Sequence, residues 1–328
     1  MSTLSRPLLA VIMFVFATSY AQAHQVGIWQ LQGWKTDFEN AKVNFHEIRS
    51  GGPPKDGIPP LDEPIFSSVS EVKNLTPQDP VIGLEINGDA RAYPLRVLIW
   101  HEIANDVVGG KPVAVTYCPL CNAAIVFDAT IDGERHTFGT TGKLRKSDLI
   151  MYDRKTESWW QQFTGSSIVG EYAGKELKFV PARLESYGEF SQRHPDGKVL
   201  IPNNPGFRNY GRNPYVGYDD SSKPFLYSGA MPQGIEPMAR VVVVRREGAE
   251  PLVVAMQKVR ENGELSLEGH KFSWRKGQAS AVNAGDISKG KDVGTVLVNQ
   301  ADNGKPVAYD VTFAFVAHAF HPNAPIIK

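Results

Sequence analysis

Pairs of turn-forming residues recur between short runs of β-forming residues along much of this chain. Such dipeptides favour the two-residue turns of β-hairpins, because glycine, asparagine and aspartate tolerate the left-handed backbone those turns need. The main signals are Asn87-Gly88 between 81–86 and 90–95, Gly109-Gly110 between 107–108 and 113–117, and Asp132-Gly133 between 124–130 and 135–138. Ala173-Gly174 and Asn262-Gly263 also predict hairpins. The spacing restricts the chain to strands that pair mainly with their sequence neighbours.

Further β-forming runs follow at 241–244, 252–256, 295–298 and 307–315. Helical periodicity is confined to one or two turns near 95–99 and a weakly patterned stretch near 184–193. We therefore predict a mainly β fold, with antiparallel sheets built from hairpins and a few short helices. An α+β arrangement is the minority alternative. The 30 glycines and 23 prolines of the 328 residues agree with a turn-rich chain.

The charge balance excludes one broad class of partner. Lysine and arginine total 35, as do aspartate and glutamate, so the chain lacks the basic surplus of a nucleic-acid-binding protein. No apolar run reaches the roughly 20 residues that a membrane-spanning helix needs. We therefore expect no nucleic-acid partner and no membrane span.

The first residues have the pattern of a secretory signal. Arg6 precedes the apolar run 8–17, and Ala21-Gln22-Ala23 fits a small-x-small cleavage site. We predict a signal peptide over 1–23, and so a periplasmic or secreted protein. Residues 24–75 are expected to form an N-terminal arm with a proline-rich connection, and 76–328 the main β-rich domain. A subdomain boundary near 230–238 is an alternative to one continuous core.

The stretch with the clearest chemical meaning is Tyr117-Cys118-Pro119-Leu120-Cys121, which holds both cysteines of the chain. A disulfide between them would close a very small ring and stabilise the fold by only about 2 kcal/mol in the chain-entropy picture. The residues after Cys121 are β-forming, so the motif is expected on a strand–loop–strand hairpin tip. A structural staple is therefore a poor explanation for the pair.

Three interpretations of the pair compete. The first is a thiol–disulfide redox pair, in which Cys118 attacks and Cys121 resolves the mixed disulfide, with exported protein thiols or an unknown redox partner as substrate. The second is a site that binds or delivers copper or zinc; no other cofactor is expected. Two sulfurs supply half of a tetrahedral shell, so His101 or His136 would complete it. The third is an inert buried pair in a non-catalytic exported binding module.

His101 is the candidate base or metal ligand with a geometric argument behind it. Counting outward from the Gly109-Gly110 turn places His101 opposite Cys118 in an ideal hairpin. A bulge would shift that register, and an ordinary capping histidine is the alternative. Arg145 and Arg212 are candidates to stabilise a thiolate, together with Tyr117 beside the first cysteine. The segment 208–219, rich in tyrosine, either lines a cleft over the cysteines or forms a packed loop.

Several separate segments together resemble one bacterial family. These are Tyr117–Asn122, Phe138–Arg145, Ser147-Asp148-Leu149, Met151–Arg154, Trp159-Trp160-Gln161, Gly165 and Arg208–Tyr218. The chain resembles, over roughly residues 60 to 320, the uncharacterised domain of unknown function 3179 family. Some members of that family are selenoproteins with selenium at the cysteine motif, so the resemblance implies redox chemistry at Cys118 and Cys121. The family carries no established activity or substrate.

Overall fold

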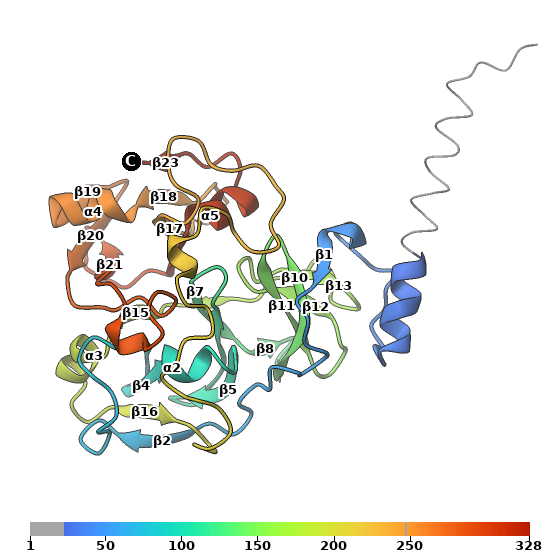
Figure 1. Cartoon of the computed structure of the whole chain (residues 1–328), viewed down its shortest axis with the longest axis horizontal. Coiled ribbons are helices and arrows are strands. Elements are labelled where there is room, and N and C mark those ends of the chain that lie inside the picture. The colour runs from blue at the N-terminus through green and yellow to red at the C-terminus, as the bar shows by residue number, and fades with distance from the viewer. Residues whose placement is uncertain (1–22, 247) are drawn as a thin grey trace, which may run out of the picture.

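The computed structural model describes residues 23–246 and 248–328. The chain is mainly β, with antiparallel pairing in most of its sheets and few short helices, as the hairpin signals predict. Five sheets of three to five strands form a propeller-like arrangement (Figure 1). In the described part of the chain, no helix combines the length and apolar character needed to cross a membrane. The predicted signal sequence falls, apart from Ala23, outside the described residues.

The sheet that carries the cysteines has the order β14-β7-β6-β5. Its strands are β5 (Ile103–Val108), β6 (Lys111–Cys118), β7 (Ala123–Asp128) and β14 (Phe179–Val180). Gly109 and Gly110 both have positive φ and join β5 to β6 as a two-residue turn, which confirms that prediction. The turn pairs Val108 with Lys111 and Ile103 with Thr116. Most of the side chains of β5, β6 and β7 are buried, so this sheet lies in the main core.

A second sheet packs beside the first and has the order β15-β3-β4-β16-β2. Its strands are β2 (Ile65–Ser68), β3 (Pro80–Ile86), β4 (Asp89–Pro94), β15 (Arg183–Ser186) and β16 (Lys198–Ile201). Asn87 and Gly88 form the predicted turn between β3 and β4, both with positive φ. The helix α2 (Leu95–Leu98) follows β4 directly, and α3 (Tyr187–Arg193) follows β15. Both helices lie in the two regions where helical periodicity was expected.

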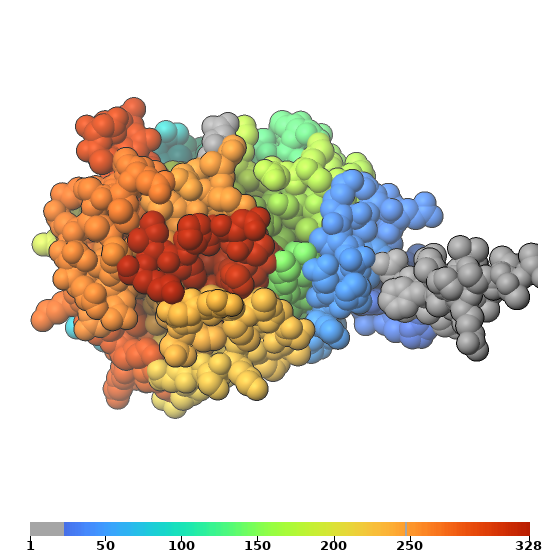
Figure 2. All heavy atoms as spheres, turned by 90° about the horizontal axis from the view of Figure 1, so that it is seen from above, coloured from blue at the N-terminus to red at the C-terminus, as the bar shows by residue number. Residues whose placement is uncertain are grey.

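The N-terminal residues pack on a third sheet of order β1-β10-β11-β12-β13. Its strands are β1 (Ile48–Ser50), β10 (Phe138–Arg145), β11 (Asp148–Asp153), β12 (Trp159–Gln161) and β13 (Ser167–Val169), with the small pair β8 (Thr130–Ile131) and β9 (Glu134–Arg135) before it. A helix over residues 23–31 and η1 (Phe45–Glu47) lead into it. Trp29 and Trp34 pack edge-on against Trp159 in a separate aromatic core. Figure 2 shows the atoms of this segment, in blue, packed against the green atoms of the residues that follow it in the middle of the chain.

Two C-terminal sheets complete the fold, with orders β22-β17-β18-β23 and β19-β20-β21. Their strands are β17 (Arg240–Val244), β18 (Leu252–Ala255), β19 (Glu264–Leu267), β20 (His270–Arg275), β21 (Thr295–Gln300), β22 (Tyr309–Phe313) and β23 (Ile326–Ile327). Three further elements are α4 (Met256–Asn262), η3 (Ile287–Lys289) and α5 (Ala314–Phe320). The last predicted strand was extended too far, because α5 begins at Ala314.

Two of the five expected hairpin turns differ from the prediction. Asn262 ends α4, and Gly263 follows with a φ of 68° as the helix cap, so this dipeptide stops a helix rather than turning a hairpin. Ala173-Gly174 lies between β13 and β14, which belong to different sheets. An Asn-Gly dipeptide can form a hairpin turn or end a helix, because each of these features needs a residue with a left-handed backbone.

Candidate functional site

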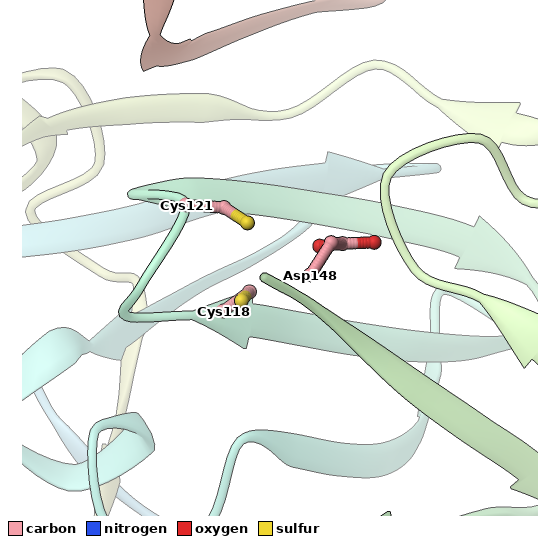
Figure 3. A group of neighbouring side chains, drawn as sticks. All are labelled: Cys118, Cys121 and Asp148. Atoms are coloured by element: carbon pink, nitrogen blue, oxygen red, sulfur yellow. The ribbon is translucent and has the colours of Figure 1, made fainter. Parts of the chain in front are cut away.

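The two cysteines occupy a hairpin tip, as predicted. Cys118 is the last residue of β6, four residues connect it to β7, and the backbone N–H of Cys121 donates to the carbonyl of Cys118 at 3.2 Å. Asn122 closes the turn with a φ of 50°, a left-handed value that asparagine tolerates better than most residues. The turn directs both sulfurs to the same side of the hairpin (Figure 3).

A strand from the C-terminal part of the chain fixes this turn. The carbonyl of Cys121 accepts hydrogen bonds from Thr312 Oγ1 at 2.7 Å and from the backbone N–H of Phe313 at 3.2 Å. Asn122 Nδ2 donates to the carbonyl of Val311 at 3.1 Å. Three contacts with β22 therefore hold the cysteine loop in one conformation.

Asp148 brings a carboxyl group to the two sulfurs. It begins β11 directly after Lys146 and Ser147, which turn the β10–β11 hairpin with φ values of 54° and 68°. The sulfurs of Cys121 and Cys118 lie 3.6 and 4.0 Å from the carbonyl oxygen of Ser147. A carboxylate oxygen of Asp148 and both sulfurs lie within 4.8 Å of one another (Figure 3). Neither Lys146 nor Ser147 favours a left-handed backbone, so the turn that presents Asp148 is strained.

The two oxygens of Asp148 have different surroundings. Oδ2 accepts hydrogen bonds from Gln161 Nε2 at 2.6 Å and from the backbone N–H of Phe163 at 2.8 Å. Oδ1 is buried and has no hydrogen-bond partner among the described residues. One oxygen is therefore fixed in place, and the other is free to accept a proton or to bind a cation.

Burial dominates the electrostatics of the site. Cys118 is 1% exposed and Cys121 is 0% exposed. Burial raises the pKa of the Cys118 thiol and raises the pKa of Cys121 still further, where the neighbouring Cys118 adds to the effect. Burial also raises the pKa of Asp148 to about 6. Both thiols are therefore protonated at neutral pH, and Asp148 is the strongest acid of the three.

Glu102 adds a second buried carboxyl group that the sequence argument missed. Its side chain is buried, and its backbone has a φ of 58° at the entrance to β5. Burial raises the pKa of Glu102 to about 8, and the charge of Asp148 contributes. The charge of Glu102 in turn raises the pKa of Cys118. Four acidic groups thus share one buried region, in which the charge of Asp148 disfavours the ionisation of Glu102 and of both cysteines.

His101, the residue chosen from the hairpin register, has other partners. Its Nδ1 lies 2.7 Å from the carbonyl oxygen of Pro59, and its Nε2 lies 2.7 Å from the hydroxyl of Tyr210. Burial lowers the pKa of His101. The register of β5 and β6 ends at Ile103, and the left-handed Glu102 turns the chain there, so the extrapolated pairing with Cys118 does not continue.

The other candidates from the sequence lie at different distances from the sulfurs. Arg145 pairs with Glu47 and reaches the site only through Gln161, whose Oε1 lies 3.5 Å from its Nη1. Arg212 is exposed and forms an isolated β-bridge with Asp286. Tyr117 is fully buried, burial strongly raises its pKa, and its hydroxyl has no hydrogen-bond partner in the described chain.

His136, the second histidine of the metal alternative, is buried beside Asp153. Its Nδ1 lies 3.6 Å from Asp153 Oδ1, and its ring packs edge-on against Tyr172. In the described part of the chain, the one group of three closely spaced ligand atoms comes from Cys118, Cys121 and Asp148. A metal at the cysteines would therefore take a carboxylate, not a histidine, as its third ligand.

An uncharged pocket of about 420 Å³ lies at the outer side of the cysteine loop. Its walls are Leu120, Pro214, Tyr215, Val216, Gly217, Tyr218, Ser221 and Phe225. Burial raises the pKa of Tyr215 and of Tyr218. The charges of Glu102 and then Cys118 add to the effect at Tyr215, and the charge of Cys121 adds to it at Tyr218. Residues 214–225, with η2 (Tyr218–Asp220), therefore cover the sulfurs and also line a pocket.

Asp148 belongs to a segment that the family resemblance included. Its position beside the sulfurs depends on the β10–β11 hairpin, whose turn comes about thirty residues after Cys118 in the chain.

Comparison with known families matches residues 55–324 to the family described as Protein of unknown function (DUF3179). No curated protein and no solved structure matches the chain.

Proposed function

The chain belongs to the DUF3179 family, whose description names no activity, and we propose from the site itself that the protein is a thiol–disulfide redox protein. Cys118 and Cys121 would cycle between a dithiol and a disulfide. The observation that carries the proposal is the convergence of two free thiols on one buried carboxyl group. Asp148 supplies what a buried thiol pair lacks, a nearby proton acceptor.

Disulfide formation releases two protons and two electrons, and burial prevents the sulfurs from losing those protons directly to water. With a pKa of about 6, Asp148 is ionised at neutral pH and can accept one proton from a thiol. The unpartnered Oδ1 is the oxygen available for that transfer. A disulfide in the partner accepts the two electrons and is reduced to two thiols.

The two cysteines differ in a way that supports one order of attack. Burial raises the pKa of both thiols, but the pKa of Cys118 rises less, because hydrogen bonds from Cys121 and from the backbone N–H of Leu149 lower it. Cys118 is therefore the first thiolate and attacks the partner disulfide, which expels one partner thiolate. Cys121 then attacks the Cys118 sulfur and releases the second partner thiolate.

Burial of both sulfurs requires the covering residues to move before a partner can react. Residues 214–225 contain little regular structure, and Val216 and Phe225 are exposed. We propose that this segment opens when the partner binds. Exported protein thiols and disulfides are the proposed partners, because the pattern of residues 1–23 is that of a secretory signal.

Redox titration tests the proposal directly. The full chain is equilibrated with glutathione or dithiothreitol buffers, the thiols are trapped with an alkylating reagent, and mass spectrometry measures the oxidised fraction. We expect a reversible two-electron transition, abolished by Cys118→Ser and by Cys121→Ser. Thiols that stay reduced in every buffer and react only after denaturation would instead identify an inert pair.

Asp148→Asn tests the role assigned to the carboxyl group. Asparagine retains an oxygen that can accept the hydrogen bonds now made to Oδ2 but cannot take up a proton. We expect the rate of thiol–disulfide exchange at pH 7 to fall about tenfold or more, since a positioned proton acceptor typically contributes at least that much. The pH dependence between 5 and 7 should also disappear. An unchanged rate with the same pH profile would remove Asp148 from the mechanism.

A metal site is the second candidate, and a specific observation favours it. Two sulfurs and a carboxylate oxygen converge, and one Asp148 oxygen has no partner. A bound Zn²⁺ or Cu(I) would lower the pKa values that burial and mutual repulsion raise, and Cys118, Cys121 and Asp148 would hold it. Metal analysis of the protein purified without chelators separates the candidates. Stoichiometric metal that Cys118→Ser removes would replace the redox assignment.

Export is a separate part of the proposal and needs its own measurement. Expression of the full chain in a bacterial host, followed by fractionation and N-terminal sequencing, should find the mature protein outside the cytoplasm and beginning at His24. An intact N-terminus in the cytoplasmic fraction would contradict it.

A further inference from the structure

A cavity of about 540 Å³ lies away from the cysteines. It is bounded by β3, β15, β21 and the chain before β22, with Lys111 at its edge. Lys111 begins β6 and Cys118 ends it, so the cavity and the cysteine site lie at opposite ends of one strand. Figure 1 places β15, α3 and β21 on the same side of the molecule. Its volume is typical of small-molecule binding sites.

Positive charge dominates the walls of this cavity. Four basic side chains line it, from Lys111, Arg183, Arg193 and Lys305, against the single acidic side chain of Glu85. Such an excess is local, because the whole chain carries equal numbers of acidic and basic residues. The walls therefore attract an anion.

Two of the four cations are already engaged within the fold. Arg193 makes a bidentate pair with Glu185 at 2.6 and 2.5 Å, and Lys111 lies 3.1 Å from Asp128. Arg183 and Lys305 have no carboxylate within ion-pair distance among residues 23–246 and 248–328. Arg183 lies opposite Gly83 in the pairing of β15 with β3, and both residues line the cavity. Arg183 is thus the cation positioned to meet a ligand.

The floor of the cavity is built to keep Arg193 in place. Glu185 is 0% exposed and lies against Gly83, where a Cβ atom would come within 2.0 Å of its Oε1. Glycine at this position therefore allows the carboxylate to lie under the floor. Arg193 Nε also donates to His194 Nε2 at 2.9 Å. All three guanidinium nitrogens of Arg193 are thus engaged, so this side chain forms a fixed wall and leaves Arg183 and Lys305 to meet an anion.

Besides the charged residues, Asn87 and His194, the lining is apolar. The apolar part consists of Ile86, Val180, Pro181, Ala182, Val298, Pro306 and Val307, with the ring of Tyr309. The hydroxyl of Tyr309 is bound to the carbonyl of Val296 at 2.7 Å, so it offers no donor to the cavity. An inorganic anion would leave this surface in contact with water, whereas a ligand with an apolar body would cover it.

We propose that this cavity binds a small organic carboxylate with an apolar body, such as an aromatic or branched-chain acid. The carboxylate lies against Arg183, with Lys305 at the entrance, and the apolar body covers the valine and proline side chains. The binding is independent of the cysteine chemistry, because the cavity shares none of the side chains of the cysteine site.

Calorimetric titration of the full chain with phenylacetate tests the proposal, with phenylacetamide and inorganic phosphate as comparison ligands. We expect phenylacetate to bind with a Kd of about 1 mM or tighter, and the neutral amide and phosphate each at least about tenfold more weakly. Equal binding of the amide would exclude a role for charge. Equal binding of phosphate would exclude the apolar body.

Variants that remove one charge each test whether phenylacetate binds in this cavity. Arg183→Gln should weaken phenylacetate binding at least about tenfold, and Glu85→Gln should strengthen it, because it removes the one acidic side chain of the lining. Arg212→Gln, an exposed arginine outside the cavity, is the matched control and should leave binding unchanged. The melting temperature of each variant establishes that it is folded. If neither Arg183→Gln nor Glu85→Gln changes the affinity for phenylacetate, the proposal is wrong.

Discussion

Glu102 and Glu185 are both buried glutamates, but their surroundings are opposite. Glu185 lies opposite Arg193, which binds both of its oxygens and opposes the effect of burial on its pKa. For Glu102, burial and then the charge of Asp148 raise the pKa to about 8. The carboxyl group of Glu185 has a structural partner, whereas that of Glu102 is protonated and loses its proton close to neutral pH. The difference separates a carboxylate that supports the fold from one suited to proton transfer.

The largest effect is expected at the paired glutamate. Arg193→Met leaves Glu185 buried without its partner, and unpaired buried charges cost about 3–5 kcal/mol. The free energy of unfolding, measured in urea at pH 7, should fall by that amount. The double variant Arg193→Met with Glu185→Gln should recover at least half of the loss. If Arg193→Met lowers the free energy of unfolding by less than about 1 kcal/mol, Glu185 does not depend on its partner, and the two glutamates do not differ in this respect.

At the unpaired glutamate we expect the opposite sign. The folded state binds a proton on Glu102 up to about pH 8, whereas the unfolded state loses it near 4.5, so stability falls as the pH rises through that window. Glu102→Gln should therefore stabilise the protein by about 3 kcal/mol at pH 7 and have little effect at pH 4. Urea unfolding across this range measures it. A pH dependence identical to that of the unmodified protein would contradict the assignment.

A buried base extends the comparison beyond acids. The ammonium of Lys143 lies 5.3 to 6.0 Å from the ring centres of Trp29, Trp34 and Trp159, and burial lowers its pKa to about 8. Between pH 8 and 10 the unfolded chain binds more protons, so stability rises with pH. Lys143→Met should remove about 1–2 kcal/mol of that rise, allowing for partial exposure to solvent. Urea unfolding with a reductant present measures how the free energy of unfolding changes with pH. The same change in the variant and in the unmodified protein would show that Lys143 is exposed to solvent.

The smallest effect is expected at Arg212. It is exposed, so Arg212→Gln should change the free energy of unfolding by no more than about 0.5 kcal/mol. The reduction potential of the cysteine pair should also stay the same. A shift in that potential would support the thiolate-stabilising role that the sequence suggested for Arg212. It would also mean that residues without direct contact to the sulfurs belong to the site.

Local signals predicted much of the fold. Asn87-Gly88 and Gly109-Gly110 both turn hairpins, because the dipeptide itself has the backbone conformation that the turn requires. The position of the cysteines on a hairpin tip followed from the strand-forming residues after Cys121. Asn262-Gly263 shows the limit of such signals, since the preceding residues decide whether a left-handed glycine ends a helix or turns a hairpin.

The site needed information that no local pattern contains. Counting from a turn placed His101 opposite Cys118, but the count assumes that the strand continues past Ile103. Glu102 interrupts it with a left-handed backbone, so the glutamate and not the histidine interacts with Asp148 and Cys118. Asp148 arrives from a different sheet, and its neighbourhood depends on how two hairpins pack. The position of the cysteine pair was therefore accessible from the sequence, and the carboxyl groups beside it were not.

The bonds from Thr312 and Phe313 to the carbonyl of Cys121 have a consequence for folding. Thr312 lies 191 residues after Cys121 in the chain, so the cysteine loop takes its final shape only once β22 has docked against it. Before that contact forms, both sulfurs are open to oxidants and to other thiols. The docking of one distant strand therefore decides when the two thiols become inaccessible.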